Sequence, residues 1–373
     1  MAPPALAARL YGAYFAGRRR LEAALTPRPP APGPFDPTRV HRALLVCTGL
    51  IGDSVMCLPA LRAARELLPK AELVGLVTEM GRTLLGATDC LDRFILCDGA
   101  PLRLRAGPRA ATRELERQLA AEGPSLAVIL LGDDYAPLLT RAGVPHRVFV
   151  AESAFASLAT ATYSIGDART WGPEERLGAW RALGLRPRRE LPPLSPPPQA
   201  LSAVAARLQG IPRPWVVLHP FGSTMDQWWP LPAAAAASRS LKERFGGSVL
   251  LVGGQKGRVP VPPLPPEVID LFGQLTLEEL IALIALSDCV ISTDSGPFHL
   301  AGAMGRGGVG LFRASRPEHA GRYPSMATVM APDLAECRAA CRWNRCGFRP
   351  CRQMAGLSPQ AVVDAVGTSL RRP

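Results

Sequence analysis

The sequence is poor in lysine, in aromatic residues and in long apolar runs, and each scarcity narrows the range of functions. Lysine occurs at three positions, so arginine provides most of the net charge of +12. A basic balance suits anionic partners such as a nucleotide, a phosphorylated sugar or an acidic membrane surface. Aromatic residues make up 6% of the chain and form no recognised nucleic-acid motif with basic residues, so we expect no nucleic-acid partner.

The lack of a long apolar segment argues against a membrane-spanning protein. No run reaches the roughly 18 residues of a membrane span. Arg9 and the arginines at 18–20 also interrupt the apolar N-terminus, where a signal peptide needs continuity. We therefore expect a cytoplasmic location. Residues 6–25 still predict an amphipathic helix, which either lies on the anionic cytoplasmic face of a membrane or packs on its own domain or on a partner.

Proline-rich segments divide the chain, whose 373 residues leave room for two domains of ordinary size. Residues 26–37 and 186–198 contain too much proline for a continuous helix. The predicted divisions are an N-terminal helical extension and Pro-rich linker (1–37), a first domain (38–185), a Pro/Arg-rich linker with a short helix (186–214), a second domain (215–356) and a C-terminal helix (357–373).

Apolar runs of strand length alternate with helical patterns in both domains. The predicted strands are residues 42–47, 72–77, 93–97, 126–131, 215–220, 248–252 and 268–272, and the intervening helices include 54–68 and 277–286. This alternation is typical of α/β folds with doubly wound parallel sheets. The loop at 49–52 lacks the full glycine fingerprint of a dinucleotide site, so we expect no nicotinamide cofactor.

The stretch at 290–301 combines a buried strand, a polar turn and a helix start. Asp294, Ser295 and Gly296 follow the strand, and His299 lies on the first turns of the helix. Free N–H groups and the positive end of the helix dipole would face this turn, which suits a phosphate group. The alternative is an ordinary strand-turn-helix in which Asp294 is only the N-cap.

Asp53 is the candidate catalytic residue of the first domain. It follows a predicted strand closely, at the edge where ligands of open α/β sheets bind. A carboxylate there could take a proton from an acceptor hydroxyl. The alternative is a helix N-cap, a role that aspartate fills well.

Four segments, in order, are similar to segments of the bacterial ADP-heptose:lipopolysaccharide heptosyltransferases of glycosyltransferase family nine. They are Gly-Asp…Pro-Ala-Leu-Arg within 49–62, His-Pro…Trp-Pro within 219–230, Gly-x-x-Thr-Leu-x-Glu-Leu at 273–280 and Asp-Ser-Gly-x-x-His-Leu-Ala at 294–301. The last segment is fairly specific, and the set in this order is more so. The resemblance spans residues 40–320.

The resemblance implies a GT-B architecture, in which two Rossmann-like domains face a cleft. It further implies an inverting transfer that needs no metal or other cofactor. Heptose would pass from ADP-heptose on the second domain to a saccharide or glycolipid acceptor, such as lipopolysaccharide inner core, on the first. Asp53 would match the general base, beside the acceptor-side loop of Gly49 and Gly52. The donor-binding positions would be Asp294, Ser295, Gly296, His299, Gln227, Thr276 and Glu278.

One position departs from the family's pattern. The family has a lysine shortly before its Trp-Pro pair, thought to neutralise the leaving diphosphate, whereas this chain has Gln227. Glutamine can donate a hydrogen bond but carries no charge, so it would stabilise the diphosphate less. Lys256 or Arg313 could replace the missing cation. Otherwise the chain uses another nucleotide sugar or a natural-product acceptor, or it binds sugar nucleotides without catalysis.

Four of the nine cysteines cluster near the C-terminus, at Cys337, Cys341, Cys346 and Cys351. In a cytosolic chain, clustered cysteines favour metal binding over disulfides. Their spacings do not fit the usual zinc pattern of two pairs. The region also resembles a Cys-rich segment of several heptosyltransferases, which need not hold a metal. A structural metal outside the reaction and a metal-free segment both stay open.

Overall fold

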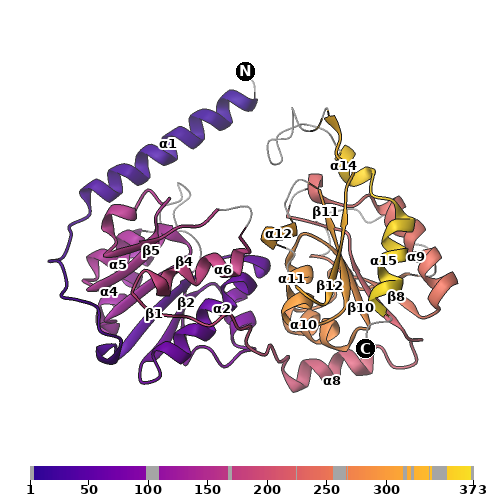
Figure 1. Ribbon diagram of the computed structural model, residues 1–373, viewed down its shortest axis with the longest axis horizontal. Coiled ribbons are helices and arrows are strands. Elements are labelled where there is room, and N and C mark those ends of the chain that lie inside the picture. The colour runs from indigo at the N-terminus through magenta and orange to yellow at the C-terminus, as the bar shows by residue number, and fades with distance from the viewer. Residues whose placement is uncertain are drawn as a thin grey trace. The chain divides into compact units, whose positions relative to one another are not determined.

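The computed structural model describes residues 4–97, 109–166, 170–223, 225–254, 266, 268–313, 317–320, 323–335, 337 and 351–370. The chain divides into two compact units. The first contains Met1–Gly49, Met56–Gly166 and Gly172–Pro192, and the second contains Leu50–Val55, Asp167–Trp171 and Pro193–Pro373. Each unit is built around its own sheet (Figure 1). None of the described helices combines the length and the apolar character that a membrane crossing needs.

The first unit contains a six-stranded parallel sheet in the order β3-β2-β1-β4-β5-β6. Its strands are β1 (Arg42–Cys47), β2 (Glu72–Val77), β3 (Arg93–Leu96), β4 (Leu126–Leu131), β5 (His146–Val150) and β6 (Ala161–Tyr163). The predicted bounds of β1, β2 and β4 are confirmed, because strands buried on both faces form continuous apolar runs. β5 and β6 lie outside the predicted strands.

The first unit also contains helices and 3-10 turns. They are α1 (Pro4–Leu25), α2 (Ile51–Leu67), whose start groups with the second unit, α3 (Glu79–Leu85), α4 (Arg109–Glu122), α5 (Ala136–Arg141), α6 (Gly172–Arg176), α7 (Gly178–Arg181) and the 3-10 turns η1 (Pro37–Arg39), η2 (Asp133–Tyr135) and η3 (Ala156–Leu158). Leu44 and Val46 of β1 share one hydrophobic cluster with Leu119 of α4 and Leu138 of α5. The core therefore lies between the sheet and these helices.

The second unit repeats this topology, with a parallel sheet in the order β12-β11-β10-β7-β8-β9. Its strands are β7 (Trp215–His219), β8 (Ser248–Leu251), β9 (Val268–Asp270), β10 (Cys289–Thr293), β11 (Gly308–Phe312) and β12 (Met326–Met330). β9 ends two residues before the predicted strand, because the Asp270 side chain accepts a hydrogen bond from the Phe272 N–H, 2.8 Å away, and turns the chain.

Helices cover both faces of the second sheet. They are α8 (Pro198–Arg207), the 3-10 turn η4 (Met225–Gln227), α9 (Leu231–Phe245), α10 (Leu277–Leu286), α11 (Gly296–Ala303), α12 (Pro317–Ala320), α14 (Arg352–Ala355) and α15 (Pro359–Leu370). Figure 1 shows α10 and α11 on one side of the strands and α9 and α15 on the other. The predicted bounds of α10 are confirmed, and α15 lies within the segment 357–373 that the sequence predicts as the C-terminal helix.

Both sheets have a switch point where the strand order reverses. It lies between β1 and β4 in the first sheet and between β7 and β10 in the second. Open α/β sheets bind ligands in the crevice outside the carboxyl ends of such strands. The predicted doubly wound arrangement is thus confirmed, and it points to the residues that follow these four strands.

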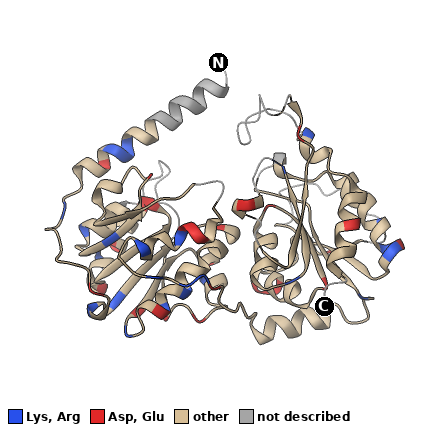
Figure 2. Cartoon of the chain, viewed as in Figure 1, with Lys and Arg blue, Asp and Glu red and all other residues tan. Residues whose placement is uncertain are grey.

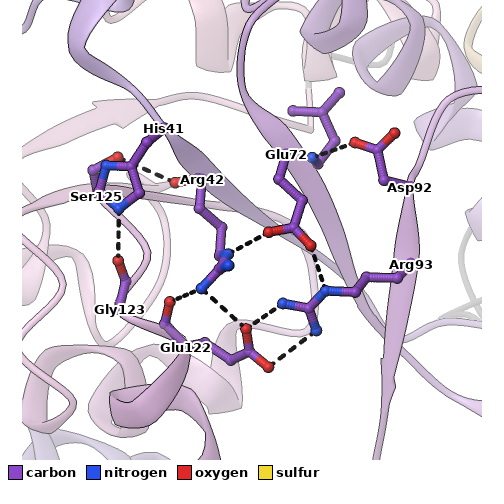
Figure 3. A network of polar contacts seen from close by, with 9 residues as sticks. His41, Arg42, Glu72, Asp92, Arg93, Glu122, Gly123 and Ser125 are labelled. Carbon is purple, nitrogen blue, oxygen red and sulfur yellow. Dashed lines mark hydrogen bonds and ion pairs between the residues drawn. The ribbon is translucent and has the colours of Figure 1, made fainter.

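A network of charged residues lies at the opposite, amino-terminal edge of the first sheet (Figure 3). Arg42, Glu72 and Arg93 begin β1, β2 and β3, and Glu122 ends α4. Glu72 bonds both arginines, and Arg93 also bonds Glu122 through two nitrogens. The Arg93 guanidinium, with Arg42, holds the pKa of both carboxyls below the ordinary value. These charges therefore join strand starts to a helix end, and they are remote from the ligand edge of the sheet.

Candidate active site

The switch point of the second sheet brings His219 next to Ser295. His219 ends β7, Ser295 follows β10, and the two strands are neighbours. Ser295 Oγ lies 3.1 Å from His219 Nδ1 and 3.0 Å from Ser292 Oγ. Desolvation by the surrounding protein lowers the pKa of His219 to about 4. The imidazole is therefore neutral near pH 7, and it holds the Ser295 hydroxyl in an uncharged polar cluster at the start of α11.

The β10–α11 turn has the strand-turn-helix form that the sequence predicts. Gly296 is the first residue of α11 and Pro297 follows it in the first turn. Ser295 is the N-cap residue, so the alternative in which Asp294 caps the helix is wrong. The Ser295 side chain makes no capping hydrogen bond, because its hydroxyl is engaged in the polar cluster. Pro297 has no N–H, and the Phe298 N–H donates to the Ser295 carbonyl at 3.1 Å. The start of α11 thus presents the Gly296 N–H and the positive end of the helix dipole at the ligand edge.

His299 lies one turn into α11 and is 3% exposed. Its Nε2 is 3.5 Å from Asp294 Oδ1, and its Nδ1 is 3.1 Å from Tyr323 Oη. Both ring nitrogens therefore face protein groups. Sequence reasoning missed Tyr323, which is separated from His299 by 24 residues and stands in no recognisable motif. It also missed the contact between His219 and Ser295, although His219 is the polar residue that ends an apolar strand.

The loop from 220 to 230 is tied to the end of β10. Thr293 Oγ1 donates a hydrogen bond to the Phe221 carbonyl, and the Trp229 N–H donates to the Pro220 carbonyl at 2.8 Å. Gln227 ends η4 in this loop. The loop therefore holds Gln227 on the side of the sheet where the β10–α11 turn lies.

Gln227 brings no positive charge to this edge. Its Oε1 accepts a hydrogen bond from Ser223 Oγ at 2.8 Å. Arg313 directly follows β11, the neighbour of β10. Of the described residues that directly follow a strand of the second sheet, it is the one with a positively charged side chain. Lys256, the other cation considered from the sequence, lies outside the described residues.

Asp53 lies in the first turn of α2 and is partly buried. Since α2 begins at Ile51, Asp53 is inside the helix, and the alternative that it is the N-cap is wrong. Its segment, Leu50–Val55, groups with the second unit, whereas Gly49 belongs to the first. A Cβ on Gly52 would lie only 2.8 Å from His299 Cδ2, so glycine allows the chain next to Asp53 to approach the imidazole.

Thr276 and Glu278 stand apart from this cluster. Thr276 is the N-cap of α10, where its hydroxyl accepts from the Glu279 N–H at 3.1 Å and Glu279 Oε2 accepts from the Thr276 N–H at 2.8 Å. This capping box explains why α10 begins at the predicted residue. Glu278 is exposed in the first turn. Donor binding by Thr276 and Glu278 stays a prediction.

The cysteine cluster is described in part. Cys337 and Cys351 are buried, and Cys341 and Cys346 lie outside the described residues. Within the part of the chain that the structure describes, no three histidine, cysteine or acidic side chains come together as a metal site. The cysteine site therefore stays a prediction.

Comparisons with known proteins agree with this geometry. Residues 193–348 match the sequence model of glycosyltransferase family 9 (heptosyltransferase). The chain is similar to the solved glycosyl transferase family 9 structure from Veillonella parvula (TM-score 0.76, 16% identity, covering 91% of this chain and 99% of that one). It is also similar to ADP-heptose LPS heptosyltransferase II of E. coli (TM-score 0.70, 19% identity, covering 88% of this chain and 98% of that one). A further similar structure is E. coli heptosyltransferase WaaC with ADP (TM-score 0.64, 18% identity, covering 88% of this chain and 99% of that one). No curated protein sequence matches the chain. The shared fold is GT-B.

Proposed function

We propose that this glycosyltransferase, whose residues 193–348 match the sequence model of family 9 (heptosyltransferase), transfers heptose from ADP-heptose to a saccharide hydroxyl with inversion at the anomeric carbon. The β10–α11 turn carries this proposal, since Ser295 and Gly296 stand at the switch point of the second sheet in front of a helix start. Backbone N–H groups in this position suit a diphosphate. The likeness to ADP-heptose LPS heptosyltransferase II of E. coli and to E. coli heptosyltransferase WaaC with ADP supports ADP-heptose as the donor.

In the proposed reaction the acceptor oxygen attacks the anomeric carbon while Asp53 takes the hydroxyl proton. A new carbon–oxygen bond forms, the bond from the anomeric carbon to the diphosphate breaks, and ADP leaves with the electron pair. The Gly296 N–H and the dipole of α11, with Arg313 at the same sheet edge, stabilise the charge on ADP. No divalent ion is needed for this step. The Asp294 carboxylate would repel phosphate. We therefore assign Asp294 to holding the turn and the His299 ring rather than to binding the diphosphate.

The acceptor we favour is lipopolysaccharide inner core, reached from the cytoplasmic face of the membrane. The outer face of α1 supports a peripheral membrane contact. Tyr14, Leu21 and Leu25 are 52%, 58% and 71% exposed, and the arginines at 18–20 form the basic stretch that is blue on α1 in Figure 2. An exposed apolar stripe beside basic residues suits an anionic lipid surface.

A second donor is favoured by one observation, the uncharged Gln227 in the donor-side loop. With less positive charge near the diphosphate, the chain could use another nucleotide sugar, with a natural-product acceptor.

A structural metal at the four cysteines is a separate proposal. Two of its thiols are buried in the second unit, and thiolate ligands suit zinc or iron. Metal analysis of the purified chain tests it, and a metal-free folded protein would refute it.

The donor and the base are tested together. We expect ADP to raise the melting temperature more than GDP, UDP or dTDP, equally with EDTA and with Mg²⁺, because a ligand of the native state stabilises it by mass action. Asp53→Asn should keep this ADP effect and lose about 10²- to 10⁴-fold of heptosyl transfer. Asp89→Asn, at an exposed carboxyl of the first unit, is the matched control and should transfer normally.

Three results would each refute a different part of the proposed function. If Asp53→Asn transfers at the rate of the unmodified chain, Asp53 is not the base. If another nucleotide stabilises better than ADP, the donor is a different nucleotide sugar. If EDTA abolishes the ADP effect, binding needs a divalent ion.

A further inference from the structure

Tyr323 is buried against α11 with its hydroxyl on His299. It is 2% exposed, and its Oη lies 3.1 Å from His299 Nδ1. The rings of Trp171 and Phe298 each meet the Tyr323 ring edge to face, with centroids 5.7 Å apart. Gly302, three residues after His299 on the same helix, leaves the space that the ring occupies, since a Cβ there would overlap it. Packing therefore fixes where the tyrosine hydroxyl points.

The groups that face the two ring nitrogens of His299 determine which nitrogen carries the proton when the ring is neutral. Asp294 Oδ1 lies 3.5 Å from Nε2, and an ionised carboxylate can only accept, so the proton is favoured on Nε2. In a neutral imidazole Nδ1 then has a lone pair. The Tyr323 hydroxyl fills this acceptor by donating its proton. Tyr323 thus hydrogen-bonds one ring nitrogen of His299, and the other ring nitrogen faces the Asp294 carboxylate at the β10–α11 turn.

We propose that Tyr323 is a positioning residue that selects the Nε2–H tautomer of the neutral His299 ring. In this form the imidazole holds the Asp294 carboxylate at the turn, and its Cδ2 edge meets Gly52, the residue before Asp53. One buried side chain thereby aligns the diphosphate turn and the segment of the base. The effect on catalysis rests on the function proposed above, whereas the proton position does not.

The proton position is measured directly by ¹⁵N NMR of histidine-labelled protein. The chain has five histidines, and His299→Gln assigns the signal of interest. We expect a pyrrole-like Nε2 and a pyridine-like Nδ1 in the unmodified chain. Tyr323→Phe removes only the hydroxyl and should give a mixture of the two neutral tautomers. Gly302→Ala, which displaces the Tyr323 ring but keeps its hydroxyl, should do the same.

Tyr163→Phe is the matched control. Tyr163 is a buried tyrosine of the first unit whose Oη donates to the Ile129 carbonyl at 2.9 Å. Its loss should lower stability by a similar amount, about 1 kcal/mol, and leave the His299 tautomer unchanged. In transfer assays we expect Tyr323→Phe to lower kcat about tenfold, with the donor KM kept within about twofold, because alignment rather than binding is lost.

Two sets of results would overturn the proposal. A protonated Nδ1 in the unmodified chain, or the same His299 tautomer in Tyr323→Phe, would show that Tyr323 does not lock the ring. A tautomer mixture with unchanged kcat would refute the role in catalysis. Absence of heptosyl transfer in the unmodified chain would refute the proposed function but leave the NMR result intact, so the two failures are distinguishable.

Discussion

Around the β10–α11 turn, single side chains set the charge that a diphosphate would meet. Asp294 is acidic, while Ser295, His219 and Gln227 are neutral, the imidazole because desolvation lowers its pKa to about 4. Arg313 lies after the neighbouring strand β11. The helix start supplies partial positive charge, but a diphosphate carries more than that, so the side chain at 227 should determine how tightly it is held.

Gln227→Lys should therefore tighten ADP binding about tenfold, because a charge-assisted hydrogen bond exceeds a neutral one by roughly 1.4 kcal/mol. Adenosine affinity should not change, since adenosine lacks the diphosphate. Titration calorimetry with both ligands measures the difference. Met225→Lys, at an exposed position of the same 3-10 turn, is the matched control. Equal gains in both variants would show a general charge effect, and no gain at 227 would place the diphosphate elsewhere.

The site is predictable from the sequence where its residues are local. Asp294 to His299 occupy one segment, so the turn and the helix start follow from a strand pattern, a glycine and a proline. Ser295 and His219 are 76 residues apart, and their contact depends on strand order, which no local pattern contains. Tyr323 depends on tertiary packing in the same way. The N-cap alternatives fail for a finer reason, because α11 starts one residue later and α2 starts three residues earlier than an aspartate N-cap at 294 or 53 requires.

At the scale of elements, α1 shows how one helix can serve two surfaces. Its inner side chains are fixed to the first unit: Arg19 pairs with Asp133 and Asp134, and Glu22 bonds Arg141 at 2.8 Å. The apolar side chains at 14, 21 and 25 point away from these contacts and are exposed. The side chains before residue 14 lie outside the described part. Packing and membrane contact, the two alternatives drawn from the sequence, thus become compatible.

We expect the chain to bind vesicles that contain anionic lipid and to bind neutral vesicles much less. Replacing Arg18 and Arg20 by alanine should weaken binding about 30-fold, because each basic residue near an anionic surface contributes about 1 kcal/mol. Co-sedimentation with vesicles measures this. Leu21→Ser should weaken binding too, whereas Leu96→Ser, at another exposed leucine of the first unit, should not. Equal binding by all variants would exclude α1 as the contact.

The elements themselves were predictable in proportion to their burial and their caps. β1, β2 and β4 are continuous apolar runs, and α10 has a capping box, so their bounds follow from the sequence. β5 and β6 lie away from the switch point, β6 at the end of the sheet. β6 has three residues, with a partly buried, exposed and buried pattern. A strand this short gives no periodic signal, and pairing with its neighbour defines it.

For the whole molecule, the two units repeat one strand order but differ in what their switch points present. The second unit has a neutral polar cluster and a helix start at β7 and β10. In the first, Thr48 follows β1 and the acidic pair Asp133 and Asp134 follows β4, and Arg19 contacts both acids. Since the diphosphate is anionic, its binding energy should stabilise mainly the second unit.

Hydrogen exchange separates the two units in one experiment. At about 100 times its Kd, ADP stabilises the unit that binds it by about 2.7 kcal/mol. Amides of β7, β10 and α11 that exchange by unfolding of the second unit should slow about 100-fold, whereas amides of β4, β5 and α4 should keep their rates. Slowing confined to the first unit would place the nucleotide there and refute the donor assignment. Equal slowing of exchange in both units would show that they unfold as one. Ligand binding slows exchange only of amides that exchange through unfolding of the ligand-binding unit.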